Sequence, residues 1–177
     1  RDLHEISKLF AEGPIDIVGH SRGAIVAALF AAIVPEKINR LVLIDSIEPF
    51  PRKISDLPQD LADSLRSNYS LSGRSGTLYP NREGALAARV KSDIPVSLAS
   101  AELLAERSLR EVEKGWVWQA DQRLKATNAY RITDEMRGDF FKLLEAPTLV
   151  IEPEHGLLKL DPKLNNAGSA IPNLTRK

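Results

Sequence analysis

A serine between two glycines stands near the start of the chain, in the run Ile-Asp-Ile-Val-Gly-His-Ser-Arg-Gly over residues 15–23. Gly-x-Ser-x-Gly after a β-branched run and before an Ala-rich helical segment is typical of a nucleophile elbow. At such a strand-to-helix turn the hydroxyl of Ser21 is lifted clear of the sheet, and Gly19 and Gly23 let the backbone bend. The following helix directs its N-terminus at the same point, so the backbone N–H of Arg22 is predicted to help hold an oxyanion. Ser21 is the predicted nucleophile.

A serine hydroxyl is a weak nucleophile at neutral pH and needs a general base, usually a histidine that a carboxylate orients. The chain holds three histidines. We interpret His4 as a surface residue of an N-terminal helix, and His20 as a packing or substrate-pocket residue whose side chain the elbow turns away from Ser21. His155 lies where the acid is expected in the order nucleophile, acid, histidine, and no histidine follows it in the sequence. The base is therefore expected outside this chain.

The elements that must position Ser21 form a β-α-β pattern. A strand is predicted over residues 15–18 and a helix over 22–34, which Pro35 ends. The continuous apolar run from Arg40 to Asp45 is typical of a strand buried on both faces of a parallel sheet. Outside this unit the patterns predict a helix over residues 2–11, a third strand over 147–151 and a fourth over 171–175.

Residues 46–146 differ in composition from the rest of the chain, since they are charged and helical in period. We predict that they form a helical insertion between two parts of one core, residues 1–45 and 147–177. Trp116 and Trp118 are candidate walls of an apolar substrate pocket, and the core of the insertion is the alternative place for them. Within the insertion the patterns predict a loop over residues 67–82 and helices over 82–90, 97–112 and 133–144.

The composition excludes several classes of protein. Lys and Arg number 24 and Asp and Glu also number 24, so no net charge favours nucleic acid or an anionic membrane as a partner. The absence of cysteine excludes disulfides, thiolate metal sites and cysteine nucleophiles. No metal-ligand cluster or Gly-rich phosphate loop is visible, and we expect no metal and no cofactor. The longest apolar stretch, residues 24–34, is shorter than the roughly 20 residues of a membrane helix, and no signal peptide is visible, so we expect a soluble, cytoplasmic protein.

The elbow, the run of residues 35–45 and the run Ala-Pro-Thr-Leu-Val-Ile over 146–151 follow one another in an order that resembles the α/β-hydrolase superfamily. The segments Gly-Trp-Val-Trp at 115–118, Asp-x-Arg-Leu at 121–124, Tyr-Arg-Ile-Thr at 130–133 and Glu-His-Gly-Leu-Leu at 154–158 are similar to its serine-hydrolase-like branch. The resemblance implies an α/β fold, a mostly parallel sheet flanked by helices with a helical cap insertion.

The same resemblance implies elements that the 177 residues do not contain. Relatives have strands before the position of Arg1, with a loop that carries a second oxyanion donor. They also have a strand and loop after the position of Lys177, and this loop carries the catalytic histidine. The sequence is therefore expected to be a fragment of a longer hydrolase, with an incomplete fold and no activity by itself.

The resemblance leaves the acid of the triad open. Most relatives place it after the strand that matches residues 147–151, in a Gly-x-x-Asp context, whereas Gly156 takes the expected place of the aspartate here. Some relatives instead use a carboxylate at the end of the strand after the elbow helix, where Asp45 stands. Asp45 is the first candidate. The alternatives are Glu154, and then Glu152 and Glu48.

Together these residues predict hydrolysis of a small carboxylic ester through an acyl-enzyme, with amides and thioesters as alternative substrates. A serine nucleophile argues against the haloalkane dehalogenase and epoxide hydrolase members, which use a carboxylate. A cofactor-free haloperoxidase or lyase remains open, because the elbow does not fix the reaction. The side chain of Arg22 either steers an anionic substrate or pairs with a carboxylate of the insertion. From another class, the alternative is a catalytically silent binding protein of the same fold, or an inactive fragment.

Overall fold

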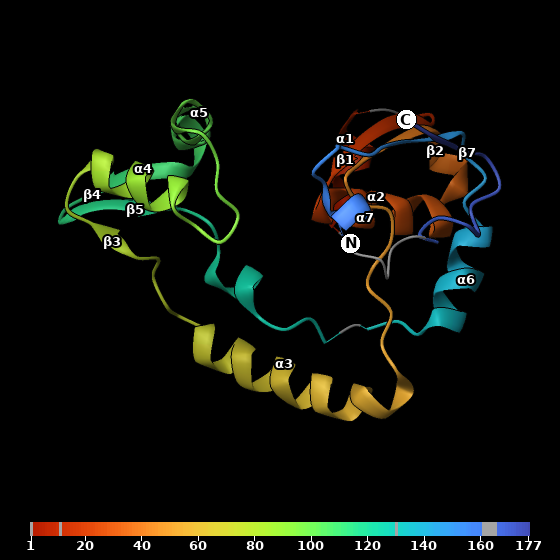
Figure 1. Ribbon diagram of the computed structural model, residues 1–177, viewed down its shortest axis with the longest axis horizontal. Helices are drawn as coiled ribbons and strands as arrows, with labels where there is room; N and C mark the ends of the chain where they lie inside the picture. The colour runs from red at the N-terminus through yellow and green to blue at the C-terminus, as the bar shows by residue number, and fades with distance from the viewer. Residues whose placement is uncertain (1, 11, 130, 161–165) are drawn as a thin grey trace. The chain divides into compact units, whose positions relative to one another are not determined.

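A four-stranded parallel sheet carries the serine elbow, and the computed structural model describes residues 2–10, 12–129, 131–160 and 166–177 (Figure 1). The strands are β1 (Ile15–His20), β2 (Ile38–Ile44), β6 (Thr148–Ile151) and β7 (Leu174–Arg176). They lie in the order β1-β2-β6-β7, and every neighbouring pair is parallel. The mostly parallel sheet predicted from the sequence is confirmed.

The two middle strands of this sheet have buried apolar side chains. Leu41 and Leu43 of β2 and Val150 of β6 are buried, as the continuous apolar runs predict. The strand at the edge differs, because Val18 of β1 is 69% exposed. Compared with the predicted strands, β1 continues for two residues to His20, β2 begins two residues earlier at residue 38, and β7 begins three residues later at residue 174.

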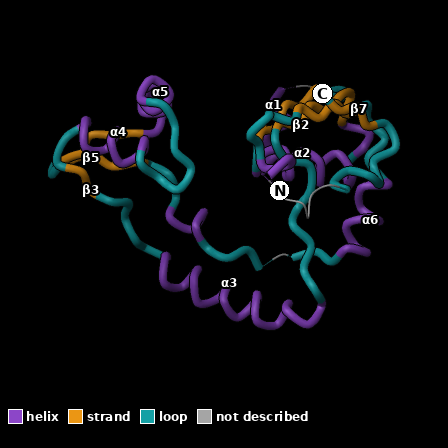
Figure 2. The backbone as a smooth tube through the Cα atoms, viewed as in Figure 1, coloured by secondary structure: helices purple, strands orange, loops and turns teal. Residues whose placement is uncertain are grey.

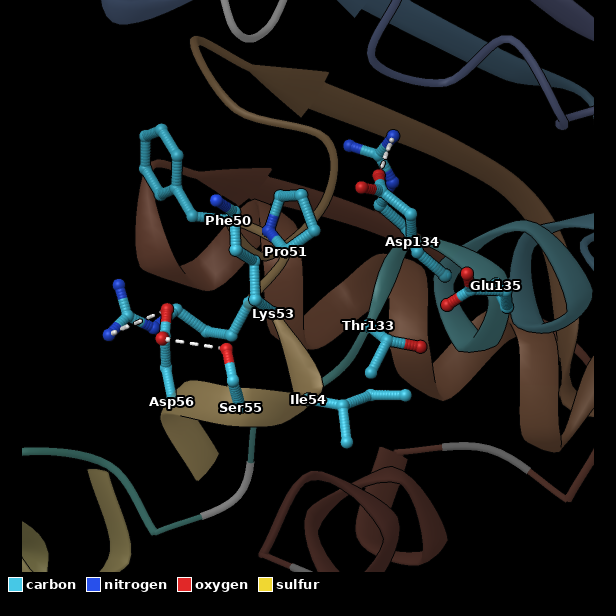
Figure 3. A pocket seen from close by; sticks show the side chains of 11 residues that line it. Phe50, Pro51, Lys53, Ile54, Ser55, Asp56, Thr133, Asp134 and Glu135 are labelled. Carbon is cyan, nitrogen blue, oxygen red and sulfur yellow. Dashed lines mark hydrogen bonds and ion pairs between the residues drawn. The ribbon is translucent and has the colours of Figure 1, made fainter. Parts of the chain in front are cut away.

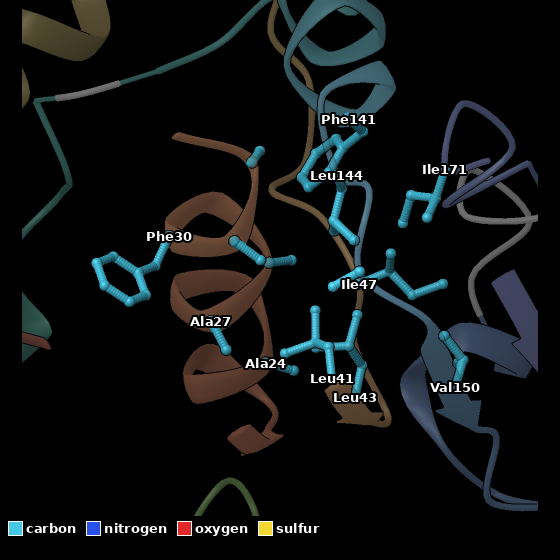
Figure 4. Packing of buried hydrophobic residues seen from close by; sticks show 14 of the residues in the cluster. Ala24, Ala27, Phe30, Leu41, Leu43, Ile47, Phe141, Leu144, Val150 and Ile171 are labelled. Carbon is cyan, nitrogen blue, oxygen red and sulfur yellow. The ribbon is translucent and has the colours of Figure 1, made fainter. Parts of the chain in front are cut away.

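One helix packs closely on the sheet because its contact face is made of alanine. Helix α2 (Arg22–Ile33) contacts β1, β2 and helix α6 (Asp134–Lys142). Figure 4 shows Ala24 directed towards Leu41 and Leu43 of β2. Small side chains at these positions let the helix backbone approach the strands. The buried alanines of α2 are Ala24, Ala27, Ala28, Ala31 and Ala32.

Of the remaining helices of this unit, the predictions over residues 2–11 and 133–144 are confirmed, and the shorter helices were not predicted. Helix α6 begins after Thr133, whose hydroxyl accepts a hydrogen bond from the backbone N–H of Met136 and so caps the helix. Ala11, the last residue of the predicted N-terminal helix, lies outside the described residues. Across the described residues, no helix has the length and apolar character needed to cross a membrane. The other helices are α1 (Asp2–Phe10), α7 (Leu157–Leu160) and the 3-10 helices η1 (Pro35–Lys37) and η2 (Ile54–Asp56).

The chain divides into two compact units, one formed by Arg1–Leu57 with Tyr130–Lys177 and the other by Pro58–Ala129. The second unit is narrower than the predicted insertion and falls within it. It contains helices and an antiparallel sheet of order β3-β5-β4, coloured separately in Figure 2. The sequence predicted the helix over residues 82–90 and most of the one over 98–108, but neither the helix over 57–71 nor this sheet. The elements are α3 (Leu57–Leu71), β3 (Leu78–Tyr79), α4 (Arg82–Val90), α5 (Leu98–Ser108), β4 (Leu109–Val112), β5 (Gly115–Trp118) and η3 (Gln122–Lys125).

Two predictions inside the insertion are wrong. Helix α3 continues to residue 71, where a loop was predicted from residue 67, and polar side chains of this last part bond back to a carbonyl of the same helix. Ser67 and Asn68 both donate to the carbonyl of Ser64. The helix predicted over residues 97–112 ends at residue 108, because the next four residues pair with β5 and satisfy their backbone groups there.

Phe141 and Leu143 lie two residues apart and offer a matched test of the core. Phe141 is fully buried in the cluster of Figure 4, whereas Leu143 is 56% exposed. We expect Phe141→Ala to lower the free energy of unfolding by about 3–5 kcal/mol, since it leaves a cavity. Leu143→Ala should change it by no more than about 0.5 kcal/mol. Denaturant unfolding of both variants measures this, and equal losses would contradict the described packing.

Candidate active site

Ser21 occupies a backbone conformation that L-residues rarely adopt. Its φ is 52° and its ψ is −123°, directly between the end of β1 and the start of α2. Such a conformation costs on the order of 1–3 kcal/mol and persists only where the surroundings impose it. The backbone N–H of Ser21 donates to the carbonyl of Ile44 at 2.9 Å, so the sheet hydrogen bonding continues into the turn. The predicted elbow is therefore present as a geometric feature.

The hydroxyl of Ser21 is not used to cap the helix that it precedes. Ser21 is the N-cap residue of α2, yet its side chain makes no capping hydrogen bond. By contrast, the N-cap side chains of Asn81, Ser97 and Thr133 each accept a backbone N–H. Those three residues have extended backbones, whereas Ser21 has a positive φ, which directs its side chain away from the N–H groups of the first helical turn. Ser21 is exposed, so its hydroxyl is accessible.

Of the two glycines of the motif, the described structure explains Gly19. A Cβ at Gly19 would lie 2.7 Å from the Cα of Ala24 and 2.7 Å from the carbonyl oxygen of Gly23. These are backbone atoms of α2, so they cannot yield without moving the helix. A Cβ at Gly23 would meet no atom of the described chain within 4 Å. The steric role predicted for Gly23 is therefore not seen in the part of the chain that the structure describes.

The strand register brings the residues after three strands to one edge of the sheet. His20 pairs with Ile44, and Ile44 pairs with Ile151. Ser21, Asp45 and Glu152 follow these three positions, so they stand next to one another in strand order at the carboxyl edge. In open parallel sheets this edge is where ligands bind.

Asp45 is held in an unusual position beside Gly156. It has a φ of 57°, and its backbone N–H donates to the carbonyl of Ile151 at 3.0 Å. Its Oδ1 is buried and has no hydrogen-bond partner within the described chain. A Cβ at Gly156 would lie only 2.1 Å from this Oδ1, so the carboxylate occupies the space that a side chain at Gly156 would need. A buried carboxylate oxygen without a donor is costly and marks a place where a donor is expected.

The other candidate carboxylates have different surroundings. Glu152 forms an ion pair with Arg176 of β7. Glu154 is exposed. Glu48 is buried and lies 2.8 Å from Arg137 of α6, which also lies 2.8 Å from Asp134.

The pKa of Glu48 is raised from its ordinary value. Burial is the main cause, because it removes water from the charged form. A hydrogen bond from the backbone N–H of Gly168 and the charges of Arg137 and Arg176 offset the rise only in part. Its ion pair with Arg137 joins the segment after β2 to α6.

None of the histidines is paired with Asp45 in the described part of the chain. The sequence predicted His4 as a surface residue, but in the structure it is half-buried. Its ring packs against that of Phe30 of α2 at a centroid distance of 6.1 Å. His20 is exposed at the end of β1. His155 is exposed in the turn before α7.

Arg22 is the first residue of α2. Its backbone N–H is therefore one of the four at the start of a helix that do not take part in the hydrogen bonding within the helix. The prediction that this N–H faces an oxyanion stays a prediction.

Trp116 and Trp118 lie on β5 and pack against the buried cluster of the second unit. The indole N–H of Trp118 donates to the carbonyl of Ala85 at 3.2 Å. This packing agrees with the alternative that they belong to the core of the insertion, and the substrate role stays a prediction.

An open pocket of about 880 Å³ lies where the chain leaves and re-enters the first unit. Its lining comes from residues 50–56, 133–135 and 137. The backbone N–H of Arg52 donates to the carbonyl of Ile132, just before the second of these segments, at 2.8 Å. Figure 3 shows acidic and basic side chains around it, and neither Ser21 nor Asp45 is among the lining residues. Within the described chain, no group of three or more His, Asp or Glu residues is placed to hold a metal ion.

Two residues of this region were missed by the sequence analysis. Arg137 received no role, although an arginine in the helix that returns the chain to the sheet is a natural partner for a buried acid such as Glu48. Gly156 was noted only as a missing aspartate, and no sequence pattern shows that another residue's carboxylate occupies its side-chain space.

Comparison with known proteins places the chain among similar folds. The profile of the alpha/beta hydrolase fold matches residues 1–158. The serine hydrolase-like protein of Danio rerio is 26% identical over 162 residues, which are 89% of this chain and 49% of that protein. Serine hydrolase-like protein 2 of Homo sapiens is 29% identical over 148 residues, 79% of this chain and 46% of that protein. The chain thus spans about half the length of these curated relatives.

The same similarity is seen in a solved structure. The crystal structure of a hypothetical protein from Pseudomonas aeruginosa PAO1 matches with a TM-score of 0.89 and 30% sequence identity. The match covers 99% of this chain and 63% of that chain.

Gly19 and Gly23 allow a matched test of the elbow. Gly19→Ala places a Cβ against backbone atoms of α2, and we expect it to lower the free energy of unfolding by about 1–3 kcal/mol. Gly23→Ala enters open space and should change it by no more than about 0.5 kcal/mol. Thermal and denaturant unfolding of both variants measures this. A Gly19→Ala protein as stable as the wild type would show that the turn is not as tight as described.

The raised pKa of Glu48 predicts a pH-dependent stability. Above about pH 4.3, the ordinary pKa of glutamate, the unfolded chain releases the proton while the folded protein still holds it. The free energy of unfolding should therefore fall as the pH rises from that value through the raised pKa of Glu48. Glu48→Gln carries no titrating group and should lack this decrease. Unfolding of both proteins between about pH 4 and pH 8 measures the difference, and parallel curves would contradict it.

Proposed function

Because the chain belongs to the alpha/beta hydrolase fold family, we propose that it forms part of a serine-dependent hydrolase that acts on carboxylic esters through an acyl-enzyme. Ser21 is the nucleophile of this proposal. The observation that carries it is the backbone of Ser21, which is held at a φ of 52° while its exposed hydroxyl caps no helix. Strain of this kind is kept where it presents a group for chemistry.

The proposed reaction has two steps. The Oγ of Ser21 attacks the ester carbonyl carbon, its proton passes to a general base, and the alcohol leaves with that proton. The backbone N–H of Arg22 supports the oxyanion of the tetrahedral intermediate. Water, deprotonated by the same base, then attacks the acyl-enzyme and releases the acid. The base is proposed to be a histidine outside residues 1–177, as the resemblance to the family implies.

Asp45 is proposed as the carboxylate that orients this histidine. Its carboxylate forms no ion pair within the described chain and follows β2 next to Ser21 in strand order, which suits a carboxylate that accepts from an imidazole N–H. The alternatives are less suitable, since Glu48 and Glu152 are held in ion pairs with Arg137 and Arg176. Glu154 is exposed, and water would weaken its hold on an imidazole.

His20, Trp116 and Trp118 are proposed to contact the substrate. The exposed position of His20 at the carboxyl end of β1 supports its part of this proposal. The proposed substrate is a small ester-like molecule, and the proposed location of the protein is cytoplasmic.

The second candidate function is a catalytically silent binding protein of the same fold. The observation that favours it is that none of the three histidines makes a hydrogen bond to Asp45 in the described chain. A protein of this kind would keep the elbow as a structural turn without an activated hydroxyl.

Labelling with a fluorophosphonate probe separates the two candidates. We expect the full-length protein to react at Ser21, since the probe reports an activated serine hydroxyl, and Ser21→Ala to abolish the reaction. A folded full-length protein that does not react would favour the silent binding protein.

The same probe identifies the acid. Asp45→Asn should slow labelling by about 10²- to 10⁴-fold, because the histidine loses its orienting charge. Glu154→Gln is the matched control and should label at the rate of the wild type. The opposite result would assign the acid to Glu154.

A further inference from the structure

Gly156 and Asp45 come from different elements but share one volume. A Cβ at Gly156 would lie 2.1 Å from Oδ1 and 2.8 Å from Cγ of Asp45. Both distances are far below van der Waals contact, so a side chain at Gly156 and the present carboxylate of Asp45 exclude each other. The φ of Gly156 does not lie in the left-handed region, so the glycine is required for space and not for its backbone freedom.

The backbone of each residue is held by hydrogen bonds and is not free to move aside. The backbone N–H of Gly156 donates to the carbonyl of Pro153 at 3.0 Å, and its carbonyl accepts the N–H of Lys159 at 3.2 Å. Asp45 is fixed by its hydrogen bond to the carbonyl of Ile151, and the next residue, Ser46, is buried. A side chain at position 156 would therefore be accommodated mainly by rotation of the Asp45 carboxylate.

We propose that Gly156 is a positioning residue, whose missing side chain makes the space in which the Asp45 carboxylate is held at the carboxyl edge of the sheet. This inference rests on the proposed function, in which that carboxylate orients the catalytic histidine. The environment of the carboxylate supports it, since Oδ1 is buried against Gly156 and makes no hydrogen bond within the described chain. A carboxylate can orient an imidazole only if it is itself held in one orientation, and the missing side chain of Gly156 gives Oδ1 the space for that orientation.

The first consequence concerns the smallest side chain. Gly156→Ala should displace the carboxylate by about the size of a methyl group and lower the rate of fluorophosphonate labelling by about 10- to 100-fold. The matched control is Gly138→Ala, since a Cβ there meets no described atom within 4 Å and the rate should remain that of the wild type. Near-ultraviolet circular dichroism and the melting temperature establish that both variants are folded.

The second consequence is that the carboxylate can be moved from one element to the other. In Asp45→Gly, the glycine adopts the positive φ of position 45 without strain. The substitution also removes the carboxylate that fills the space beside position 156. Adding Gly156→Asp to this variant returns a carboxylate to the same region. The double variant should be labelled at least about tenfold faster than Asp45→Gly alone. Asp45→Gly with Gly156→Asn has the same shape without the charge and should give no recovery.

The experiment measures the labelling rates of these proteins against pH, in the full-length protein. Recovery with Gly156→Asp and none with Gly156→Asn supports the positioning role, because a merely structural glycine would not distinguish a carboxylate from an amide. If Gly156→Ala does not fold, the two double variants decide, since they have no side chain at position 45 to clash. Equal rates for the two double variants, in a wild type that reacts, would overturn the inference and leave the proposed function standing. A wild type that does not react would overturn the proposed function, and the positioning role with it.

Discussion

The site depends on one close approach, that of helix α2 to the end of strand β1. The helix can begin immediately after the strand only because Gly19 has no side chain and because the first turns of α2 place alanine against the sheet. This approach forces Ser21 into a left-handed backbone and keeps its hydroxyl from capping the helix. The strain at one residue is compensated by the packing of Ala24, Leu41 and Leu43, so the core and the elbow stabilise each other.

A second constraint acts at the same edge of the sheet, on the carboxylates. Of the acidic residues near the ends of β2 and β6, Glu48 and Glu152 are held by arginines of α6 and β7. These ion pairs join elements far apart in the sequence and hold the segments after the strands in place. Asp45 has no such partner within the described chain, and its Oδ1 lies buried against Gly156 instead. Structural and chemical roles are therefore divided among acids only a few residues apart.

The sequence predicted the parts of the fold that local pattern determines. The apolar run after Pro35 and the glycine-serine motif specify a buried strand and a tight turn by themselves, and both are present. The local pattern failed where pairing with another segment determines the secondary structure. The sequence of Leu109–Val112 by itself favours a helix, but the segment forms a strand because it pairs with Gly115–Trp118. Similarly, a glycine at position 156 has no visible cause in the sequence, because the cause is a carboxylate 111 positions earlier in the chain. Contacts of this kind become visible only when the register of β2 and β6 is known.

The shared volume of Asp45 and Gly156 also restricts how the chain can change over generations. Side chains at both positions exclude each other, so the effect of a substitution at one position depends on the residue at the other. Transfer of the carboxylate from β2 to the turn before α7 requires two substitutions. One order passes through a chain with a carboxylate at neither position, and the other through a chain with a steric clash. Such sign epistasis would tend to keep a lineage with the arrangement it first acquired, even if both arrangements served equally well.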